Sequence, residues 1–249
     1  MFCNASYGPM ASERKGTPPD EAPVHAAHAE QLHTYAHDLR NRLAGLLEVL
    51  RQLRTSNTTN EEHELFAFGE QQVFAALRRT EEMLDTLGVP RSMPPPRTAL
   101  VDLMELLRAS IANQQYRLDR KQQRVLLPPA STITVAADPR QLGIVLEALL
   151  SNASKFSPIG SSITVQLRTA DGQATMDVSD EGVGLSAADL EQVFVRYAWL
   201  DSTATAGEAQ GRSTLARCKQ IALAHGGSLT AHSDGVGKGC VFTLRSPVG

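Results

Sequence analysis

The chain has 249 residues, of which 42% are hydrophobic, and its formal net charge is −3. This length allows one large domain or two modest ones, and the charge gives no general electrostatic reason to bind nucleic acid or anionic lipid. No stretch approaches the roughly 18 apolar residues expected of a membrane-spanning helix, and the N-terminus has no apolar signal core. The three cysteines have no metal-ligand spacing, so we expect a cytoplasmic protein with reduced thiols and no membrane partner.

Residues 1–23 are rich in proline, glycine, serine and alanine, a composition typical of a disordered tail. Residues 24–88 predict an antiparallel helical hairpin, because the polar run TSNTTN separates two helical stretches. Because one hairpin buries little apolar surface, we expect a homodimer in which two hairpins form a four-helix bundle. The apolar seams have heptad spacing and consist of Ala36, Leu39, Leu43, Leu46, Leu50 and Leu53 in the first helix, and of Val73, Leu77, Thr80, Leu84 and Leu87 in the second.

Residues 89–97 form a proline-rich stretch that is predicted to end the hairpin and to act as a stiff linker. Beyond it, residues 98–249 alternate helical and strand-like patterns, which predicts a separate α+β domain with a mixed or mainly antiparallel sheet. Helices are predicted at residues 101–114, 139–156 and 215–225, and strands at residues 123–128, 131–137, 161–167, 174–180, 227–233 and 240–246.

Two polar segments of this domain carry residues suited to nucleotide chemistry. In the first, EALLSNASKFSP, Asn152 and Lys155 lie three positions apart and therefore on one face of a helix. A carboxamide can bind a metal ion or a phosphate, and a lysine one turn away can neutralise a phosphate. The same two residues are also typical of an ordinary helix C-terminus, where a lysine interacts favourably with the helix dipole.

The second segment is DVSDEGVGLS. A strand-like run ends at Asp180, and Gly182 and Gly184 follow at alternate positions. Glycines allow the backbone to approach a ligand closely, and the carboxylate can accept a hydrogen bond from an exocyclic amine such as that of adenine. Ordinary turns use the same residues, so the order of the motifs along the chain is what distinguishes the two interpretations.

The first helix contributes a third motif, HDLRNRL, in which His37, Asp38 and Asn41 lie beside the apolar seam. A lone histidine on a helix is usually a packing residue. In their order, however, the motifs resemble those of the sensor histidine kinases of two-component signalling. HDLRNRL is similar to the H box of that family, LLSNASKFS to its N box, DEGVGL to its G1 box, VFVRY to its F box, and ALAHGGSLTAHS to the end of its ATP-binding domain.

The resemblance implies a dimeric helical hairpin that carries a Bergerat-type α/β sandwich, which binds ATP. It makes His37 the phosphoacceptor, because a neutral imidazole is a competent nucleophile near pH 7. Asp38 would orient or deprotonate the imidazole ring. Asn41, one turn after His37, would position a water molecule against the aspartyl phosphate of a response regulator receiver domain.

In the ATP-binding domain, the resemblance assigns a role to each polar residue of the motifs. Asn152 would bind Mg²⁺, Lys155 would face the phosphates, Asp180 would accept from the adenine amino group, Gly182 and Gly184 would shape the pocket floor, Phe194 and Tyr197 would anchor the nucleotide lid, and Arg196 is a candidate phosphate contact.

The chain departs from the family pattern at three places. Arg42 stands where the H box normally has proline, and Glu147 and Ala148 replace an often polar residue before the N-box asparagine. The glycine-rich Gly-x-Gly-Leu-Gly-Leu of the lid should fall at residues 210–215, where the chain reads QGRSTL. Those glycines let backbone N–H groups reach a triphosphate, and Arg212 is a candidate side-chain replacement for them.

We therefore expect a protein-histidine kinase with an unusual lid and reduced activity, which transfers phosphate from ATP through His37 to a response regulator. Two other classes stay open. One is a dimeric histidine phosphotransferase or regulatory pseudokinase with the same fold and little ATP-dependent activity. The other is a chaperone- or topoisomerase-type ATPase, which would not need the His37 hairpin. No sensing domain is visible before His37, so we expect a separate sensor protein or the short tail to supply the stimulus.

Overall fold

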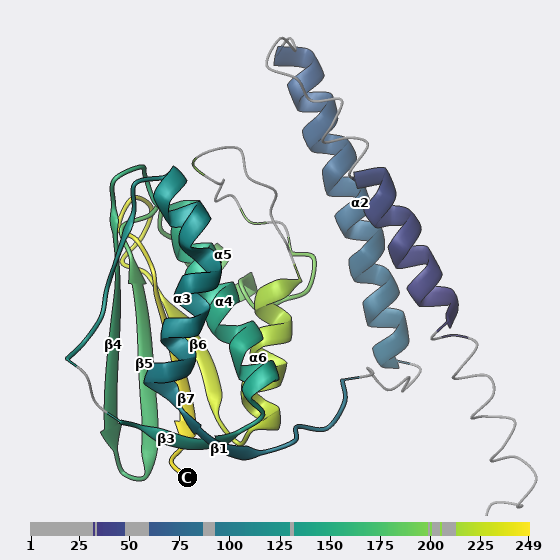
Figure 1. Ribbon diagram of the computed structural model, residues 1–249. Coiled ribbons are helices and arrows are strands. Elements are labelled where there is room, and N and C mark those ends of the chain that lie inside the picture. Colours follow the sequence, from purple (N-terminus) through teal and green to yellow (C-terminus); the bar gives the residue numbers. More distant parts are fainter. Residues whose placement is uncertain are drawn as a thin grey trace, which may run out of the picture.

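The computed structural model describes residues 32, 34–47, 60–86, 93–129, 132–198, 200, 205 and 213–249. Two antiparallel helices form a hairpin that lies beside an α/β domain (Figure 1). Residues 34–47 are helical, and α2 spans Asn60–Thr86, so the second helix begins at the last residue of the polar run TSNTTN. The predicted tail at residues 1–23 lies outside the described residues, as do the seam positions Leu50, Leu53 and Leu87.

Two small apolar clusters hold the hairpin together. Ala36 packs with Leu84 near one end, and Leu47 packs with Val73 further along, which is the pairing expected of antiparallel helices. Leu46 of the predicted seam is 55% exposed in the single chain, whereas the neighbouring Leu47 is buried. Residues three and four positions after Leu43 both lie close to its helix face, and here it is the residue four positions later, Leu47, that packs against α2.

The α/β domain contains a five-stranded sheet in the order β2-β4-β5-β7-β6 and a two-stranded sheet that pairs β1 with β3. β2 and β4 are parallel, and the other pairs are antiparallel, as the sequence predicts. The elements are β1 (Ala99–Asp102), α3 (Leu103–Arg120), β2 (Arg124–Leu126), β3 (Thr134–Ala137), α4 (Pro139–Phe156), β4 (Ser162–Ala170), β5 (Gln173–Asp180), α5 (Ala187–Gln192), α6 (Thr214–Ala224), β6 (Ser228–His232) and β7 (Val241–Pro247).

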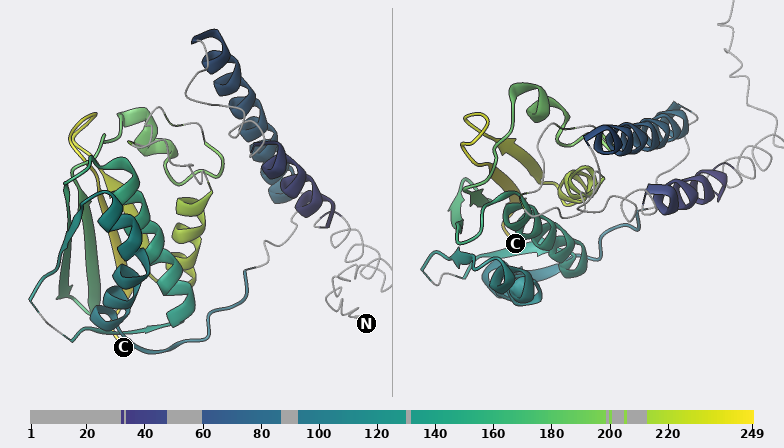
Figure 2. Two further views of the ribbon diagram at one scale, coloured as in Figure 1. Left: turned by 45° about the horizontal axis from the view of Figure 1, so that its top comes forward. Right: turned by 90° about the horizontal axis from the view of Figure 1, so that it is seen from above.

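Helices α3, α4 and α6 cover one face of the five-stranded sheet, and the core of the domain lies between the two layers (Figure 1). In the views of Figures 1 and 2, α6 is the helix of this domain nearest to the hairpin. Several of the most deeply buried side chains come from α4 and from the central strands, including Leu146, Leu149 and Met176. The sheet therefore supports α4 along its length, and α4 carries the predicted N box.

The bounds of α4 agree with the predicted range because the sequence contains both a start and a stop signal. Asp138 caps the helix by accepting from the backbone N–H groups of Arg140 and Gln141, at 3.0 and 3.3 Å, and Pro139 occupies the first turn. The helix ends at Phe156, before Ser157, which is the residue that precedes a proline.

Two elements differ from the expectation. The helix predicted from Val101 begins at Leu103, because residues 99–102 pair with β3 in an antiparallel ladder. Asp102 then caps α3 and accepts from the N–H of Met104 at 2.8 Å. The short helix α5 is capped by Ser186, and the sequence patterns did not predict it.

Candidate active site

A pocket in the α/β domain brings together the residues of the N and G1 boxes. Asn152 and Lys155 reach it from the C-terminal half of α4, and Asp180 reaches it from the end of β5. Most of the remaining lining is apolar and comes from the loop after β5, from the segment that follows α5, and from residues at the start of β7. The structure thus places three of the predicted polar residues in one cavity, although Asp180 is far from α4 in the sequence.

The C-terminal end of α4 is held by Lys121 and Gln123, which follow α3 and which sequence reasoning missed. Lys121 is 2% exposed, and its Nζ donates to the carbonyl oxygens of Ser154 at 2.7 Å and Lys155 at 3.2 Å. Its third acceptor is Oγ1 of Thr205, at 2.8 Å. A cation at this position offsets the negative end of the helix dipole, next to the turn that carries Asn152 and Lys155.

Asp180 lies at the pocket with one carboxylate oxygen already bonded. Its Oδ1 accepts from the backbone N–H groups of Gly182 at 2.9 Å and Cys240 at 3.2 Å. Burial raises the pKa of Asp180 to about 6, and these two backbone hydrogen bonds oppose that shift only in part. Both bonds go to Oδ1, so Oδ2 can accept from a ligand in the pocket.

Gly182 and Gly184 allow the loop after β5 to pack tightly. A Cβ on Gly182 would lie 2.7 Å from the carbonyl oxygen of Phe156. Gly184 has φ +68°, and a Cβ there would lie 2.1 Å from the carbonyl oxygen of Gly235. Of the two glycines predicted to shape the pocket floor, Gly184 lines the pocket, whereas Gly182 does not and donates its backbone N–H to Asp180.

Cys240 lines the pocket and is another residue that sequence reasoning missed. It lines the cavity beside Asp180, and its backbone N–H is one of the two donors to that carboxylate. Burial raises the pKa of the Cys240 thiol to about 12, so it remains protonated and acts as a small apolar wall. The sequence offered no metal spacing or nucleophile motif that would have singled it out.

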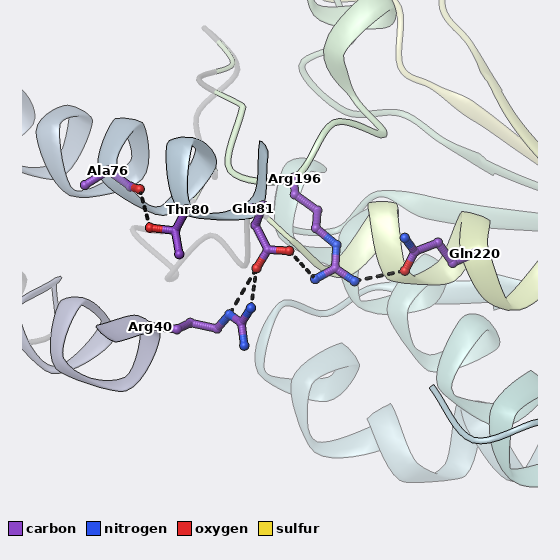
Figure 3. A network of polar contacts seen from close by, with 6 residues as sticks. All are labelled: Arg40, Ala76, Thr80, Glu81, Arg196 and Gln220. Carbon is purple, nitrogen blue, oxygen red and sulfur yellow. Dashed lines mark hydrogen bonds and ion pairs between the residues drawn. The ribbon is translucent and has the colours of Figure 1, made fainter. Parts of the chain in front are cut away.

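The segment after α5 separates the predicted lid residues. Phe194 lies in the domain core, where its ring meets that of Phe242 edge-on with a centroid distance of 6.5 Å. Tyr197 points the other way and stacks on Phe74 of α2, with a centroid distance of 6.4 Å. Arg196, predicted as a phosphate contact, does not line the pocket and instead pairs with the buried carboxylate of Glu81 in α2 (Figure 3). Arg212 lies outside the described residues.

The predicted phosphoacceptor motif lies on the exposed face of helical residues 34–47. Nδ1 of His37 lies 3.2 Å from Nδ2 of Asn41, one turn later. Asp38 accepts from Nε of Arg42 at 2.9 Å, in an exposed pair. If the Asn41 amide is turned so that its oxygen accepts from Nδ1–H, the lone pair of Nε2 is free for nucleophilic attack. Among the described residues, no hairpin side chain lines the pocket.

Comparison with known proteins extends the likeness over most of the chain. Residues 137–249 match the family described as "Histidine kinase-, DNA gyrase B-, and HSP90-like ATPase". The sensor-like histidine kinase SenX3 of Mycobacterium tuberculosis is 27% identical over 234 residues, which cover 92% of this chain and 56% of SenX3. The histidine protein kinase DivJ of Caulobacter vibrioides is 27% identical over 237 residues, covering 92% of this chain and 39% of DivJ. The chain thus spans about half the length, or less, of these relatives.

Solved structures agree on the fold. The mycobacterial sensor histidine kinase MprB is 25% identical with a TM-score of 0.52, and the match covers 60% of this chain and 98% of the MprB chain. Full-length ShkA, solved in complex with AMPPNP, has a TM-score of 0.56 at 23% identity and is matched over 88% of this chain and 46% of its own. Within the described ranges, no helix is long and apolar enough to cross a membrane. Residues 137–249 thus match this ATPase family, and over most of its length the chain is similar to sensor histidine kinases.

Proposed function

We propose that the protein is a histidine kinase that phosphorylates His37 from ATP and passes the phosphoryl group to an aspartate of a response regulator receiver domain. The observation that carries the proposal is the convergence of Asn152, Lys155 and Asp180 in one pocket of a domain that matches this ATPase family. The hairpin is assigned residues 24–88, the linker residues 89–97 and the catalytic domain residues 98–249.

The pocket has the polarity that an adenine nucleotide requires. Oδ2 of Asp180 would accept from the exocyclic amine of adenine, while the apolar wall that includes Cys240 would cover the base. Gly184 would lie on the floor of this adenine site. Lys155 would place its ammonium near the phosphates, where it offsets their charge.

Asn152 is the residue proposed to hold Mg²⁺. The described residues contain no cluster of three or more His, Cys, Asp or Glu side chains that could hold a metal ion by themselves. Mg²⁺ in nucleotide sites usually has one or two protein ligands and completes its shell with water and phosphate oxygens. A single carboxamide oxygen at the pocket fits that mode, and the ion would neutralise charge that develops on the phosphates.

The proposed phosphoryl transfer begins with attack of the His37 Nε2 lone pair on the γ-phosphorus of ATP. A new N–P bond forms while the bond from the γ-phosphorus to the bridging oxygen breaks, and ADP leaves with that electron pair. Nδ2 of Asn41 faces Nδ1 of His37, and with this amide turned so that its oxygen accepts from Nδ1–H, Asn41 would keep the tautomer with an unprotonated Nε2. Asp38 would support the positive charge that develops on the ring, once it exchanges its contact with Arg42.

Asn41 is also proposed to serve the reverse function, the dephosphorylation of a phosphorylated receiver domain. Its amide lies on the same exposed face as His37, where it could hold a water molecule in line with an aspartyl phosphate. In that role it would act on the partner protein, so its loss would not prevent formation of phosphohistidine.

The hairpin is proposed to form a homodimer. Several large apolar side chains of the hairpin remain exposed in the single chain, and a second copy would cover them in a four-helix bundle. These side chains are Leu46, Leu65, Phe68 and Met83. Light scattering that finds a stable monomer at micromolar concentration would contradict this part of the proposal.

A second candidate function is a histidine phosphotransferase or regulatory pseudokinase, and one observation favours it. Residues 210–215 read QGRSTL, which lacks the alternating glycines that bring backbone N–H groups to a triphosphate. Arg212 is the side chain proposed to replace these contacts. The chaperone- or topoisomerase-type ATPase is disfavoured, since it does not account for the His37 hairpin. The cytoplasmic location and the separate sensor protein remain predictions.

Incubation of the full chain with γ-labelled ATP and Mg²⁺ separates the first two functions. The kinase incorporates label that is lost in acid and kept in base, as expected of phosphohistidine. A phosphotransferase stays unlabelled with ATP but becomes labelled by a receiver domain that was phosphorylated with a small phosphodonor. Label that is stable to acid would contradict both functions, because it would lie on a hydroxyl group.

A further inference from the structure

A buried carboxylate joins the hairpin to the ATP-binding domain. The side chain of Glu81, in α2, is only 6% exposed. Its Oε1 accepts from the guanidinium of Arg40 through two nitrogens, of which Nε lies at 3.2 Å. Its Oε2 faces Nη1 of Arg196 at 3.5 Å, and Nη2 of Arg196 donates to Oε1 of Gln220 in α6 at 2.9 Å (Figure 3). One carboxylate thus bridges both hairpin helices and the ATP-binding domain.

Glu81 offsets the charge of both arginines. The arginine side chains are 30% and 21% exposed, so water screens their mutual repulsion only in part. Burial alone lowers the pKa of the Arg40 guanidinium, but its hydrogen bond and charge interaction with Glu81 raise the pKa above its ordinary value. Loss of the carboxylate charge would remove this attraction from both arginines at the interface, and the domains would separate more readily.

An aromatic contact lies beside this ion pair. Tyr197 stacks on Phe74 and packs against the apolar cluster that Leu47, Val73 and Leu77 form in the hairpin. Tyr197 has φ +56°, in the left-handed region that a residue with a Cβ rarely adopts. Such a conformation persists where surrounding contacts hold it, and here the contacts come from the hairpin.

The same segment forms a wall of the nucleotide pocket. Val193, Val195 and Ala198 line the cavity, while Arg196 and Tyr197, between them in the sequence, contact the hairpin. One short segment therefore forms the pocket wall on one side and the contact with the hairpin on the other. Any movement of this segment changes the contact with the hairpin, and the reverse also holds.

We infer that Glu81 clamps the ATP-binding domain onto its own hairpin in a resting arrangement, and that the clamp opens before His37 is phosphorylated. No described residue of the hairpin lines the pocket, so within one chain His37 and a bound nucleotide meet only after the domain moves. Arg40 lies three residues after His37 on the same helix, so the clamp also restrains the turn that carries the acceptor. The inference rests on the proposed kinase function for its phosphorylation readout alone.

Hydrogen exchange of the full chain tests the clamp without any need for activity. Glu81→Gln keeps the size of the side chain but removes its charge. We expect exchange at residues 193–198 to become about tenfold faster, the factor that corresponds to one charge-assisted hydrogen bond. Glu82→Gln is the matched control, because Glu82 is exposed and pairs with Arg78 within α2 at 3.7 Å. Equal exchange in the two variants would overturn the inference.

Arg196→Gln removes the same contact from the side of the ATP-binding domain. Because Arg196 lies outside the hairpin, this variant distinguishes loss of the contact from a loss of hairpin stability. It should accelerate exchange as Glu81→Gln does, and the double variant should add little, because both remove one interaction. Fully additive effects would overturn the clamp.

The phosphorylation readout decides whether the clamp is a resting arrangement. At saturating ATP, Glu81→Gln should label His37 severalfold faster than the wild type, and Glu82→Gln should not. Slower labelling would overturn the resting arrangement and make the docked state the productive one. If the wild type does not label at all, the kinase proposal fails, whereas the exchange experiment still decides the clamp.

Discussion

The pocket and the helix that carries the proposed phosphoacceptor His37 are built in opposite ways. The pocket residues Asn152 and Lys155 come from α4, Asp180 comes from the end of β5, and the packing of the domain brings the two elements together. His37 and Asn41 lie within one turn on the exposed face of a single helix. Substitutions in the pocket should therefore affect folding and binding together, whereas substitutions on the acceptor face should affect chemistry alone.

The strongest test of this contrast is Gly184→Ala in the pocket loop. The variant combines a left-handed backbone with a Cβ placed 2.1 Å from a carbonyl oxygen, so the free energy of unfolding should fall by about 3–5 kcal/mol. Gly172→Ala is the matched control, since Gly172 has φ +71° but no atom within 4 Å of its Cβ position. For Gly172→Ala, the free energy of unfolding measured by chemical denaturation should fall by only about 1 kcal/mol. Equal losses would show that the close packing of the loop is not what requires Gly184.

Asp180→Asn should weaken nucleotide binding. The amide keeps the shape of the side chain but removes the negative charge of the acceptor, so ATP affinity measured by calorimetry should fall by about tenfold or more. An unchanged affinity would remove Asp180 from adenine recognition.

The pH dependence of binding follows from the same carboxylate. Its pKa is about 6 in the folded protein and 3.8 in the reference state, so the folded state holds the proton more tightly. The contribution of Asp180 to stability is therefore present below pH 3.8 and is lost as the pH rises through about 6. Nucleotide affinity depends on pH in the opposite direction, because ATP is bound by the protein with an ionised Asp180. ATP affinity should fall by up to about tenfold between pH 7 and pH 5. Asp180→Asn should lack this pH dependence of ATP affinity. An identical pH profile in both proteins would contradict the assignment of Asp180 to adenine recognition.

The sequence predicted the regions that local signals define. A cap, a proline and a serine–proline stop delimit α4, and a strand that runs into glycines locates Asp180. Sequence patterns failed where a distant partner decides the structure. Residues 99–102 became a strand because they pair with β3.

The same limit applies to single residues of the site. Lys121 binds carbonyl groups at the end of α4, a helix that begins at Pro139, eighteen positions later. No periodicity in the sequence reveals a contact over that distance. Arg196 was predicted to meet phosphate because its motif belongs to the lid, yet its partner Glu81 lies 115 positions away in the hairpin. A buried charge pair of this kind has no local signature.

Asn41→Ala should have the smallest effect on the protein itself. The side chain is exposed, so the free energy of unfolding should change by less than about 0.5 kcal/mol. Phosphohistidine should still form, while dephosphorylation of the partner receiver domain slows, because no amide positions the water. A receiver phosphatase assay checks this, and an unchanged rate would remove Asn41 from that function.

The most direct test of the account measures phosphohistidine and ATP affinity together in His37→Gln. The side chain is exposed and no described hairpin residue lines the pocket, so nucleotide affinity should equal that of the wild type. Label from γ-labelled ATP that is lost in acid and kept in base should disappear entirely. Retention of such label in His37→Gln would contradict the account, because the phosphoacceptor would then be another histidine.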